Sequence, residues 1–485
     1  MKKTILLNLS LLIFVNLLIK PIYIFGIDRK LQLIVGQSEY GFYIELLTFT
    51  LLFQALNDLG LYNYTIRHFS QTKSTDTNLV SNLFGVKLIF SVVYLAIISI
   101  ITFLHHDYVD SWKLILHLAF NQILIQFIFF FRSFITGAGF YKTDSILSIL
   151  DRLLLIIIGF IFLYTPSLQH LITIPWFVNL QTLSLIVCFT IALFIYFQKI
   201  SSSISIQFNW SVSKKILTSC FPFILIYFFN IAYTRQDVIW IGNFVQNGNE
   251  ENGLYASSMR LYEAFTMISL AFGSLALGMF SKFYETKKML TEVFVTMGKV
   301  LLFITIGISV FIFFNANWVN QLLYHQDSEL MDKNLKIIMI GFIPGSLSFL
   351  LGAFIQAIHR EKKLVLIYLS MTILNGILNY FLVPTLASYG AAWSMIITQF
   401  AVTIAILYYS IDLLESNALI GIFKSGIGFL VTNVFLYYII QFYCGNSAIW
   451  IQISLSALIT ISLGFSFKLI DLAEIKELSL KRENI

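Results

Sequence analysis

Long apolar stretches separated by short polar segments constrain this chain more than any other feature. Fourteen of them fall near residues 4–26, 40–64, 80–104, 113–138, 145–164, 171–197, 216–245, 253–280, 293–314, 334–358, 364–384, 389–411, 419–443 and 446–468. Each matches the ~20 apolar residues that an α-helix needs to cross the hydrocarbon core of a bilayer. Continuous runs of this kind argue against a transmembrane barrel, whose strands alternate apolar and polar residues. The sequence therefore predicts an all-α polytopic membrane protein with about 14 transmembrane helices.

The composition supports a membrane class and gives no sign of chemistry on a cofactor. Only 12% of the residues are charged and 58% are hydrophobic, whereas soluble domains average about 25% charged residues. The net charge of +6 is spread between the apolar stretches, so it indicates membrane orientation and no nucleic-acid partner is expected. Cys188, Cys220 and Cys444 lie in or beside apolar stretches without metal-ligand spacing. We expect no metal, no cofactor and no disulfide framework.

Basic residues alternate between successive polar segments, which predicts the orientation of the chain. Cations occur near 2–3, 67–73, 142, 199–215, 282–288, 360–363, 424 and 468–482, whereas 165–175, 246–252, 385–388 and 444–446 contain none. Arg29 and Lys30 are the clear exceptions. Because cytoplasmic segments are enriched in Lys and Arg, this alternation predicts an even number of spans with both termini in the cytoplasm.

The predicted outer loops are short, and the longest covers about 315–333. Membrane polymerases and ligases that act on lipid-linked sugars usually need a sizeable outer loop for their catalytic groups, so a transporter is favoured.

A weak internal repeat also points to a transporter. Gly41-Phe-Tyr43 and Gly253-Leu-Tyr255 open two stretches that lie six spans apart. Transporters are often built from such repeats, with halves related by an axis along the membrane normal.

Charged residues inside the apolar stretches are the candidates for function. A charge at the centre of a membrane helix costs about 2.5–3.5 kcal/mol on insertion scales, so each needs a partner, a water-filled cavity or a nearby interface. The eight residues of this kind are Asp58, Lys87, Arg132, Arg152, Arg235, Asp237, Arg260 and Glu263.

Arg260 and Glu263 are three residues apart and therefore share one helical face. Two explanations of this group stay open. Arg260 and Glu263 could form an ion-pair network with Arg235 and Asp237, since intramembrane charges often pair with one another. Alternatively, the arginines could line a hydrated cavity and bind a diphosphate, because a planar guanidinium engages two phosphate oxygens at once.

The remaining charges lie closer to membrane interfaces. Arg67 and Arg132 are expected to extend to the lipid headgroups. Lys87 and Arg152 lie about two turns inside, so a cavity and an interface both remain open for them. Asp58 is expected to pair with one of these two, and no role is expected for Glu45. We predict no catalytic residue; the substrate-binding candidates are Arg260, Arg235, Arg152, Lys87 and Arg132, and the charge-pair or ion-coupling candidates are Asp58, Asp237 and Glu263.

Several motifs, taken in order, resemble one transporter family. Arg235–Gly242 and Gly253–Glu263 resemble the seventh and eighth helices of polysaccharide exporters of the multidrug/oligosaccharidyl-lipid/polysaccharide (MOP) superfamily. Further matching segments are Tyr40–Tyr43, Asp58–Gly60, Gly352–Lys363, Asn375–Pro384 and Tyr389–Ala392. The chain departs from the family pattern at Gly278–Lys282, which lacks the proline that many relatives carry before the basic residue.

This resemblance implies a Wzx-type flippase, which is a transporter and not an enzyme. Such a protein moves undecaprenyl-diphosphate-linked oligosaccharide repeat units from the inner to the outer leaflet of the inner membrane, for O-antigen or capsule biosynthesis. The arginines would hold the diphosphate while the prenyl tail stays among the membrane lipids. A proton or sodium gradient would drive the cycle, and a polysaccharide polymerase or another biosynthetic protein would be a partner.

The resemblance also implies a domain organisation. Residues 1–200 and 201–412 would form two six-helix bundles related by pseudo-two-fold symmetry. Residues 413–485 would add two transmembrane helices and a short cytoplasmic tail.

Two other functions fit the sequence less well. A drug or cation exporter of the same superfamily would require a cavity rich in acids and aromatic residues, whereas the candidates here lean basic. A membrane glycosyltransferase or polymerase is disfavoured because the chain has neither long outer loops nor paired acids near one.

Overall fold

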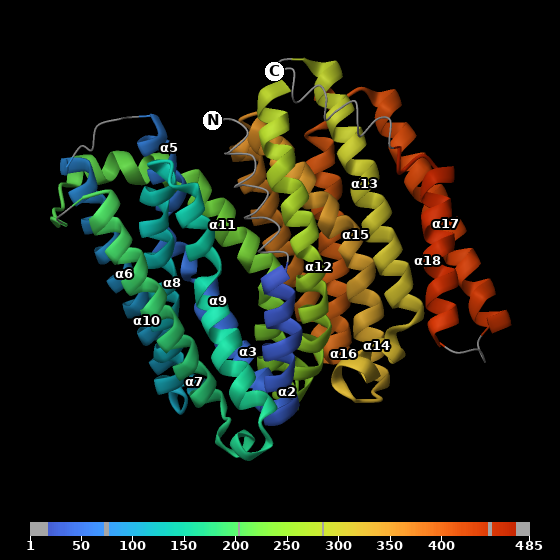
Figure 1. Cartoon of the computed structure of the whole chain (residues 1–485), viewed down its shortest axis with the longest axis horizontal. Coiled ribbons are helices and arrows are strands. Elements are labelled where there is room, and N and C mark those ends of the chain that lie inside the picture. Colours follow the sequence, from blue (N-terminus) through green and yellow to red (C-terminus); the bar gives the residue numbers. More distant parts are fainter. Residues whose placement is uncertain (1–17, 72–76, 202–203, 284–285, 445–448, 472–485) are drawn as a thin grey trace. The chain divides into compact units, whose positions relative to one another are not determined.

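A computed structural model of the protein describes residues 18–71, 77–201, 204–283, 286–444 and 449–471. Within these ranges every regular element is a helix (Figure 1). The α-helices are α2 (Arg29–Val35), α3 (Gln37–Leu52), α4 (Gln54–Asp58), α5 (Leu61–Gln71), α6 (Thr77–Leu104), α7 (His106–Val109), α8 (Trp112–Gly137), α9 (Tyr141–Tyr164), α10 (Ile174–Lys199), α11 (Trp210–Phe244), α12 (Gly248–Phe283), α13 (Lys287–Phe314), α14 (Ala316–Tyr324), α15 (Glu329–Ala357), α16 (Glu361–Tyr408), α17 (Ser416–Cys444) and α18 (Ile449–Ser466). Short π- or 3₁₀-helical turns occupy Tyr23–Asp28, Pro166–Leu171 and Ile411–Leu413.

Most of the predicted spans correspond to apolar helices of the described chain. In the described part of the chain, ten helices are long and apolar enough to cross a bilayer, and a pair bent by 44°, Gln37–Leu52 with Gln54–Ser70, raises the count to eleven. A shorter apolar helix covers Trp450–Ser466. Most of the first predicted stretch, 4–26, lies outside the described residues, and so do parts of 446–468 and the tail.

Helix α16 contains two of the predicted spans. Its 48 residues would extend about 72 Å at ~1.5 Å per residue, far beyond the ~40–45 Å of a bilayer with its headgroups. The backbone leaves the helical region at Ala387, where φ is 51° and ψ is −134°. Gly390 approaches the carbonyl of Leu382 so closely that a Cβ atom there would overlap it. The predicted stretches 364–384 and 389–411 are therefore separate helices, and the all-α polytopic fold class is confirmed.

The chain divides into two compact units, Met1–Ala256 and Ser257–Ile485. Helix α12 begins in the first unit and continues into the second. The predicted division at 1–200, 201–412 and 413–485 stays a prediction.

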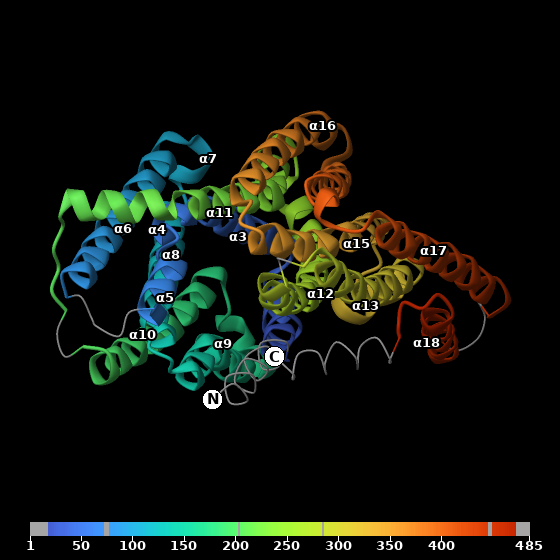
Figure 2. The ribbon, with the colours of Figure 1, turned by 90° about the horizontal axis from the view of Figure 1, so that it is seen from above.

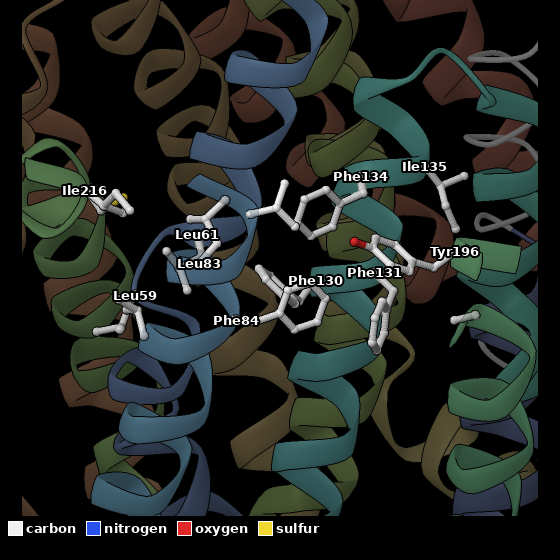
Figure 3. Close-up of a cluster of buried hydrophobic side chains, with 14 of the residues drawn as sticks. Leu59, Leu61, Leu83, Phe84, Phe130, Phe131, Phe134, Ile135, Tyr196 and Ile216 are labelled. Atoms are coloured by element: carbon white, nitrogen blue, oxygen red, sulfur yellow. The ribbon is translucent and has the colours of Figure 1, made fainter. Parts of the chain in front are cut away.

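An aromatic cluster forms the core of the first unit, and the close-up view shows its side chains facing one another across α6, α8 and α10 (Figure 3). Phe84 of α6 stacks on Phe134 of α8 and meets Tyr196 of α10 edge to face. All three side chains are at most 4% exposed. Aromatic pairs prefer such edge-to-face and offset arrangements, and they add about 0.5–1.5 kcal/mol each beyond burial. This cluster explains how a Phe-rich sequence packs helices in a lipid environment.

The second unit is centred on α15, which is the most enclosed of the long helices. It contacts α13, α14 and α16. Ser346 of α15 accepts a hydrogen bond from Ser269 of α12 at 2.7 Å. Buried small hydroxyls of this kind allow close helix contact and act as polar links between membrane helices. A second apolar cluster, which includes Leu302, Phe429 and Leu469, joins α13, α17 and the segment after α18.

Candidate functional site

Lys87 is built into the interior of the first unit. It lies on α6 and is 1% exposed. Its Nζ donates to the backbone carbonyl of Asn57 at 2.6 Å and to Asn57 Oδ1 at 3.4 Å. Because α4 ends at Asp58, the Asn57 carbonyl belongs to the last turn of that helix, where carbonyls lack helical partners and a cation is favoured. This arrangement fits a structural role, in which Lys87 caps a broken membrane helix.

Further polar side chains surround this break between α4 and α5. Asn57 Oδ1 also accepts from Ser91, at 2.8 Å. Gln54 donates to Gln122 Oε1 at 2.9 Å and accepts from Tyr227 at the same distance. Such a network satisfies the polar groups that a helix break exposes inside a membrane.

Asp58 does not form the predicted ion pair with Lys87 or Arg152. Its Oδ2 atom accepts a hydrogen bond from the backbone amide of Gly60 at 3.3 Å. Leu59 and Gly60 both have positive φ, at 53° and 66°. An Asp side chain that binds the amide two residues on is typical of a turn. Lys87 gives its hydrogen bonds to Asn57, one residue earlier, so its positive charge attracts Asp58 without a direct ion pair.

Arg132 is held inside the first unit by an ion pair. Its Nε donates to Asp144 Oδ1 at 2.7 Å, joining α8 to the start of α9, and each of the two side chains is only 8% exposed. Arg67, which was also expected to extend to the lipid headgroups, is exposed. Asp144 was not among the partners expected for Arg132.

Arg152 behaves differently from Lys87 and Arg132. It lies half-buried in α9, about 16 Å along the helix from Tyr141 at ~1.5 Å per residue. Among the described residues it forms neither a hydrogen bond nor an ion pair. Lys20, which is also half-buried and also lacks such a partner in the described chain, is close enough for the two positive charges to repel each other. The Asp151 carboxylate next to Arg152 partly offsets this repulsion.

Arg260 and Glu263 form the predicted pair within α12. Arg260 Nη1 donates to Glu263 Oε2 at 2.9 Å, and the side chains are 16% and 17% exposed. Both residues also have other contacts. The pair uses one of the five donors of the guanidinium. Both residues lie in the second unit.

Asp237 of α11 is one of three buried acids in the first unit that accept a hydrogen bond from a tyrosine. Tyr255 donates to Asp237 at 2.9 Å. Tyr40 donates to Asp28 at 2.6 Å, and Tyr108 donates to Glu45 at 3.0 Å. All three acids are at most 4% exposed. Arg235, two residues before Asp237, is half-buried and has contacts of its own.

Glu45, for which no role was expected, accepts hydrogen bonds from three residues. Besides Tyr108, it accepts hydrogen bonds from Asn243 at 3.5 Å and from Asn252 at 3.4 Å. These donors come from α7, α11 and α12, so one carboxylate links four helices of the first unit. Its position near the outer edge of an apolar stretch gave no sign of these contacts.

The two Gly-x-Tyr motifs meet in the first unit. A Cβ atom on Gly41 would overlap the carbonyl of Asn249 and crowd the amide of Gly253. A Cβ atom on Gly253 would in turn overlap the backbone of Gln37. Small residues permit such close approach of membrane helices. The sequence similarity of the motifs therefore corresponds to a contact between α3 and the start of α12.

The structure thus separates the predicted substrate-binding residues into two groups. Lys87 and Arg132 are buried and bound to other parts of the protein, whereas Arg152, Arg235 and Arg260 are half-buried within spans. Four further charged residues inside the first unit were not among the predicted site residues: Lys20, Asp28, Asp144 and Glu45. In the described part of the chain, no group of three or more His, Cys, Asp or Glu side chains is arranged to hold a metal ion.

Comparison of the sequence with known protein families identifies the family of this chain. A sequence model described as polysaccharide biosynthesis protein matches residues 6–302, more than half of the 485 residues. The chain belongs to this family. No curated protein matches the chain.

Solved structures give the fold. "Lipid II flippase MurJ, inward closed conformation" matches with a TM-score of 0.72 at 14% identity, covering 95% of this chain and 97% of that one. An inward-facing multidrug resistance MATE family transporter of the MOP superfamily matches with a TM-score of 0.62 at 15% identity, over 81% and 94%. A MOP superfamily transporter from Pyrococcus furiosus matches with a TM-score of 0.57 at 15% identity, over 84% and 94%. The chain is therefore a multi-pass membrane protein with the fold of these transporters. The sequence model confirms that it belongs to a polysaccharide family, as its motifs indicated.

Proposed function

We propose that the protein is a flippase that moves polyprenyl-diphosphate-linked oligosaccharides across the bacterial inner membrane, with both termini in the cytoplasm. The match of the polysaccharide biosynthesis family to residues 6–302 carries this proposal. The flippase and transporter folds of the solved structures support it. A transporter has no bond-making step, so the intramembrane charges serve binding and conformational change.

The diphosphate is assigned first to Lys20 and Arg152. These are two neighbouring, half-buried cations without a hydrogen-bonded or ion-paired partner in the described chain. Two adjacent cations in a membrane are unfavourable unless an anion or water compensates them, and Asp151 offsets their repulsion only in part. A diphosphate provides that compensation, and the planar fork of Arg152 suits two of its oxygens. Arg235 and Arg260 are further candidates to contact the substrate, with Glu263 orienting Arg260 through their ion pair.

The first experiment tests the class of function. A strain lacking the protein should accumulate lipid-linked oligosaccharide repeat units and lose the corresponding surface glycan. Normal surface glycan without accumulation would contradict the flippase proposal. Altered resistance to cationic drugs with normal glycan would instead indicate the drug-exporter alternative.

The second experiment tests the residues by complementation of that strain. Lys20→Ala and Arg152→Ala should abolish or strongly reduce glycan export while the protein still accumulates in the membrane. Arg152→Lys should be intermediate, because the charge remains but the bidentate fork is lost. Lys142→Ala, which removes an exposed cation of the same helix, is the matched control and should export normally. Full export by Arg152→Ala would remove this residue from the site.

Complementation of the same strain also tests whether Arg260 binds the substrate or only pairs with Glu263. If Arg260 only pairs with Glu263, exchanging the two residues should preserve export. If Arg260 binds the substrate, both the exchange and Arg260→Ala should abolish it.

A further inference from the structure

A pocket of about 470 Å³ opens in the second unit between α13, α17 and the end of α18. Figure 2 shows these three helices side by side, and α13 contacts both of the others. The residues that determine its chemistry are Lys299, Lys468, Ser425, Ser466, Gly421 and Ile422. Its volume falls within the ~300–1,000 Å³ range of small-molecule sites. No part of the proposed transport site uses these residues.

The lining combines cations and hydroxyls with an apolar wall. Lys299 comes from α13 and Lys468 follows α18, so two separate elements bring positive charge to one cavity. Ser425 and Ser466 add hydroxyl donors. Ile422 belongs to the buried apolar cluster behind the pocket. Lysine ammonium groups and hydroxyls are the donors that bind phosphate oxygens.

The lining residues lie at different distances from the ends of their helices. Lys299 lies about 18 Å along α13 from Lys287, and Gly421 lies about 8 Å along α17 from Ser416, at ~1.5 Å per residue. Lys468 lies just beyond the end of α18. The pocket therefore extends inward along α13 from the ends of α17 and α18.

The surface around the pocket suits the remainder of a lipid molecule. Ile420 and Ile427 of α17 are 51% and 60% exposed, and Phe465 of α18 is 49% exposed. Acyl chains can cover such apolar side chains while a phosphate occupies the pocket. Basic pockets between membrane helices are known to bind anionic lipid headgroups.

We propose that this pocket binds the phosphate headgroup of an anionic phospholipid from the surrounding bilayer. A zwitterionic phosphatidylethanolamine is disfavoured, because its ammonium group would lie beside Lys299 and Lys468. The headgroup stabilises the contact of α17 and α18 with α13, because it binds residues of all three. Lys424, exposed on α17 beside Ser425, adds to the positive potential at the mouth.

Native mass spectrometry of the purified full-length protein tests this proposal. The protein is incubated with equal amounts of phosphatidylglycerol and phosphatidylethanolamine, and the retained lipid is counted. Phosphatidylglycerol should be retained preferentially. Each lysine near an anionic headgroup contributes about fivefold in affinity, so the Lys299→Gln/Lys468→Gln variant should lose the preference and the corresponding double arginine variant should keep it. Equal retention of both lipids by the wild type would overturn the proposal.

Gly421 provides a variant that fills the pocket without removing a charge. A Cβ atom at this position meets no other atom within 4 Å, so a larger side chain can enter the open space. Gly421→Trp should abolish retention of phosphatidylglycerol. Gly278→Trp is the matched control, because Gly278 of α12 is equally open but lies outside the pocket. Unchanged retention by Gly421→Trp would contradict the site.

A final arm distinguishes a lipid from free phosphate. Inorganic phosphate at millimolar concentration should neither displace phosphatidylglycerol nor raise the melting temperature. Displacement of the lipid by inorganic phosphate would show a soluble-anion site and overturn the proposal.

Discussion

The carboxylate of Glu45 lies directly against the backbone of Gly242, so closely that a Cβ atom at position 242 would overlap its atoms. The same carboxylate accepts hydrogen bonds from Tyr108, Asn243 and Asn252. Gly242 therefore provides the space in which a buried acid of α3 meets α11, and the hydrogen-bond donors hold it there.

Gly242→Ala should destabilise the first unit. Because the new methyl group displaces the Glu45 carboxylate from its donors, we expect a loss of about 1–3 kcal/mol, as for other overpacked sites. The melting temperature of the purified protein measures this loss. Gly278→Ala is the control, since its methyl group meets open space and alanine favours the helix. An unchanged melting temperature in Gly242→Ala would contradict the arrangement.

The Arg132–Asp144 ion pair should be structural. Asp144→Asn leaves a buried guanidinium without its counter-charge, which costs about 3–5 kcal/mol in comparable sites. Replacing both residues with apolar ones, in Arg132→Met/Asp144→Leu, should recover most of the stability and preserve glycan export. A double-mutant cycle on melting temperatures checks the coupling. Loss of export in a stable double variant would return Arg132 to the substrate site.

Lys87 should likewise act through stability. Lys87→Met removes the donor to the Asn57 carbonyl, and an unpaired buried acceptor costs about 1–3 kcal/mol. The melting temperature should therefore fall, while Lys142→Met, at an exposed position, should leave it unchanged. The opposite result, normal melting with abolished export, would indicate that Lys87 binds the substrate.

The proposed orientation predicts which exposed positions are reached from outside the cell. In a variant without Cys188, Cys220 and Cys444, a cysteine at Asn247 should react with a membrane-impermeant thiol reagent in intact cells. Cysteines at Lys287 and Lys362 should react only after lysis. All three positions are exposed on the protein, so failure to label reflects the membrane. Reversed labelling would place both termini outside.

The family and the fold class could be predicted because their signals are continuous along the chain. Apolar runs of helical length mark the spans, and motifs such as Arg235–Gly242 mark the family. The Arg260–Glu263 pair was also within reach, since residues three apart meet on any α-helix.

The partners of the other intramembrane charges depended on tertiary structure. Lys87 meets Asn57 across 30 residues, Arg132 meets Asp144 across 12, and Glu45 meets Asn252 across 207. No local pattern encodes these separations, because each depends on which helices pack together and on where α4 breaks.

By itself, then, the sequence determined that the chain is a helical membrane protein of a polysaccharide biosynthesis family, because hydrophobic length and motifs act locally. Only the tertiary structure decided which buried charges are bound to other parts of the protein and which, like Arg152, have no hydrogen-bonded or ion-paired partner among the described residues. The physical reason is that a charge in a membrane is satisfied by whatever packing brings beside it.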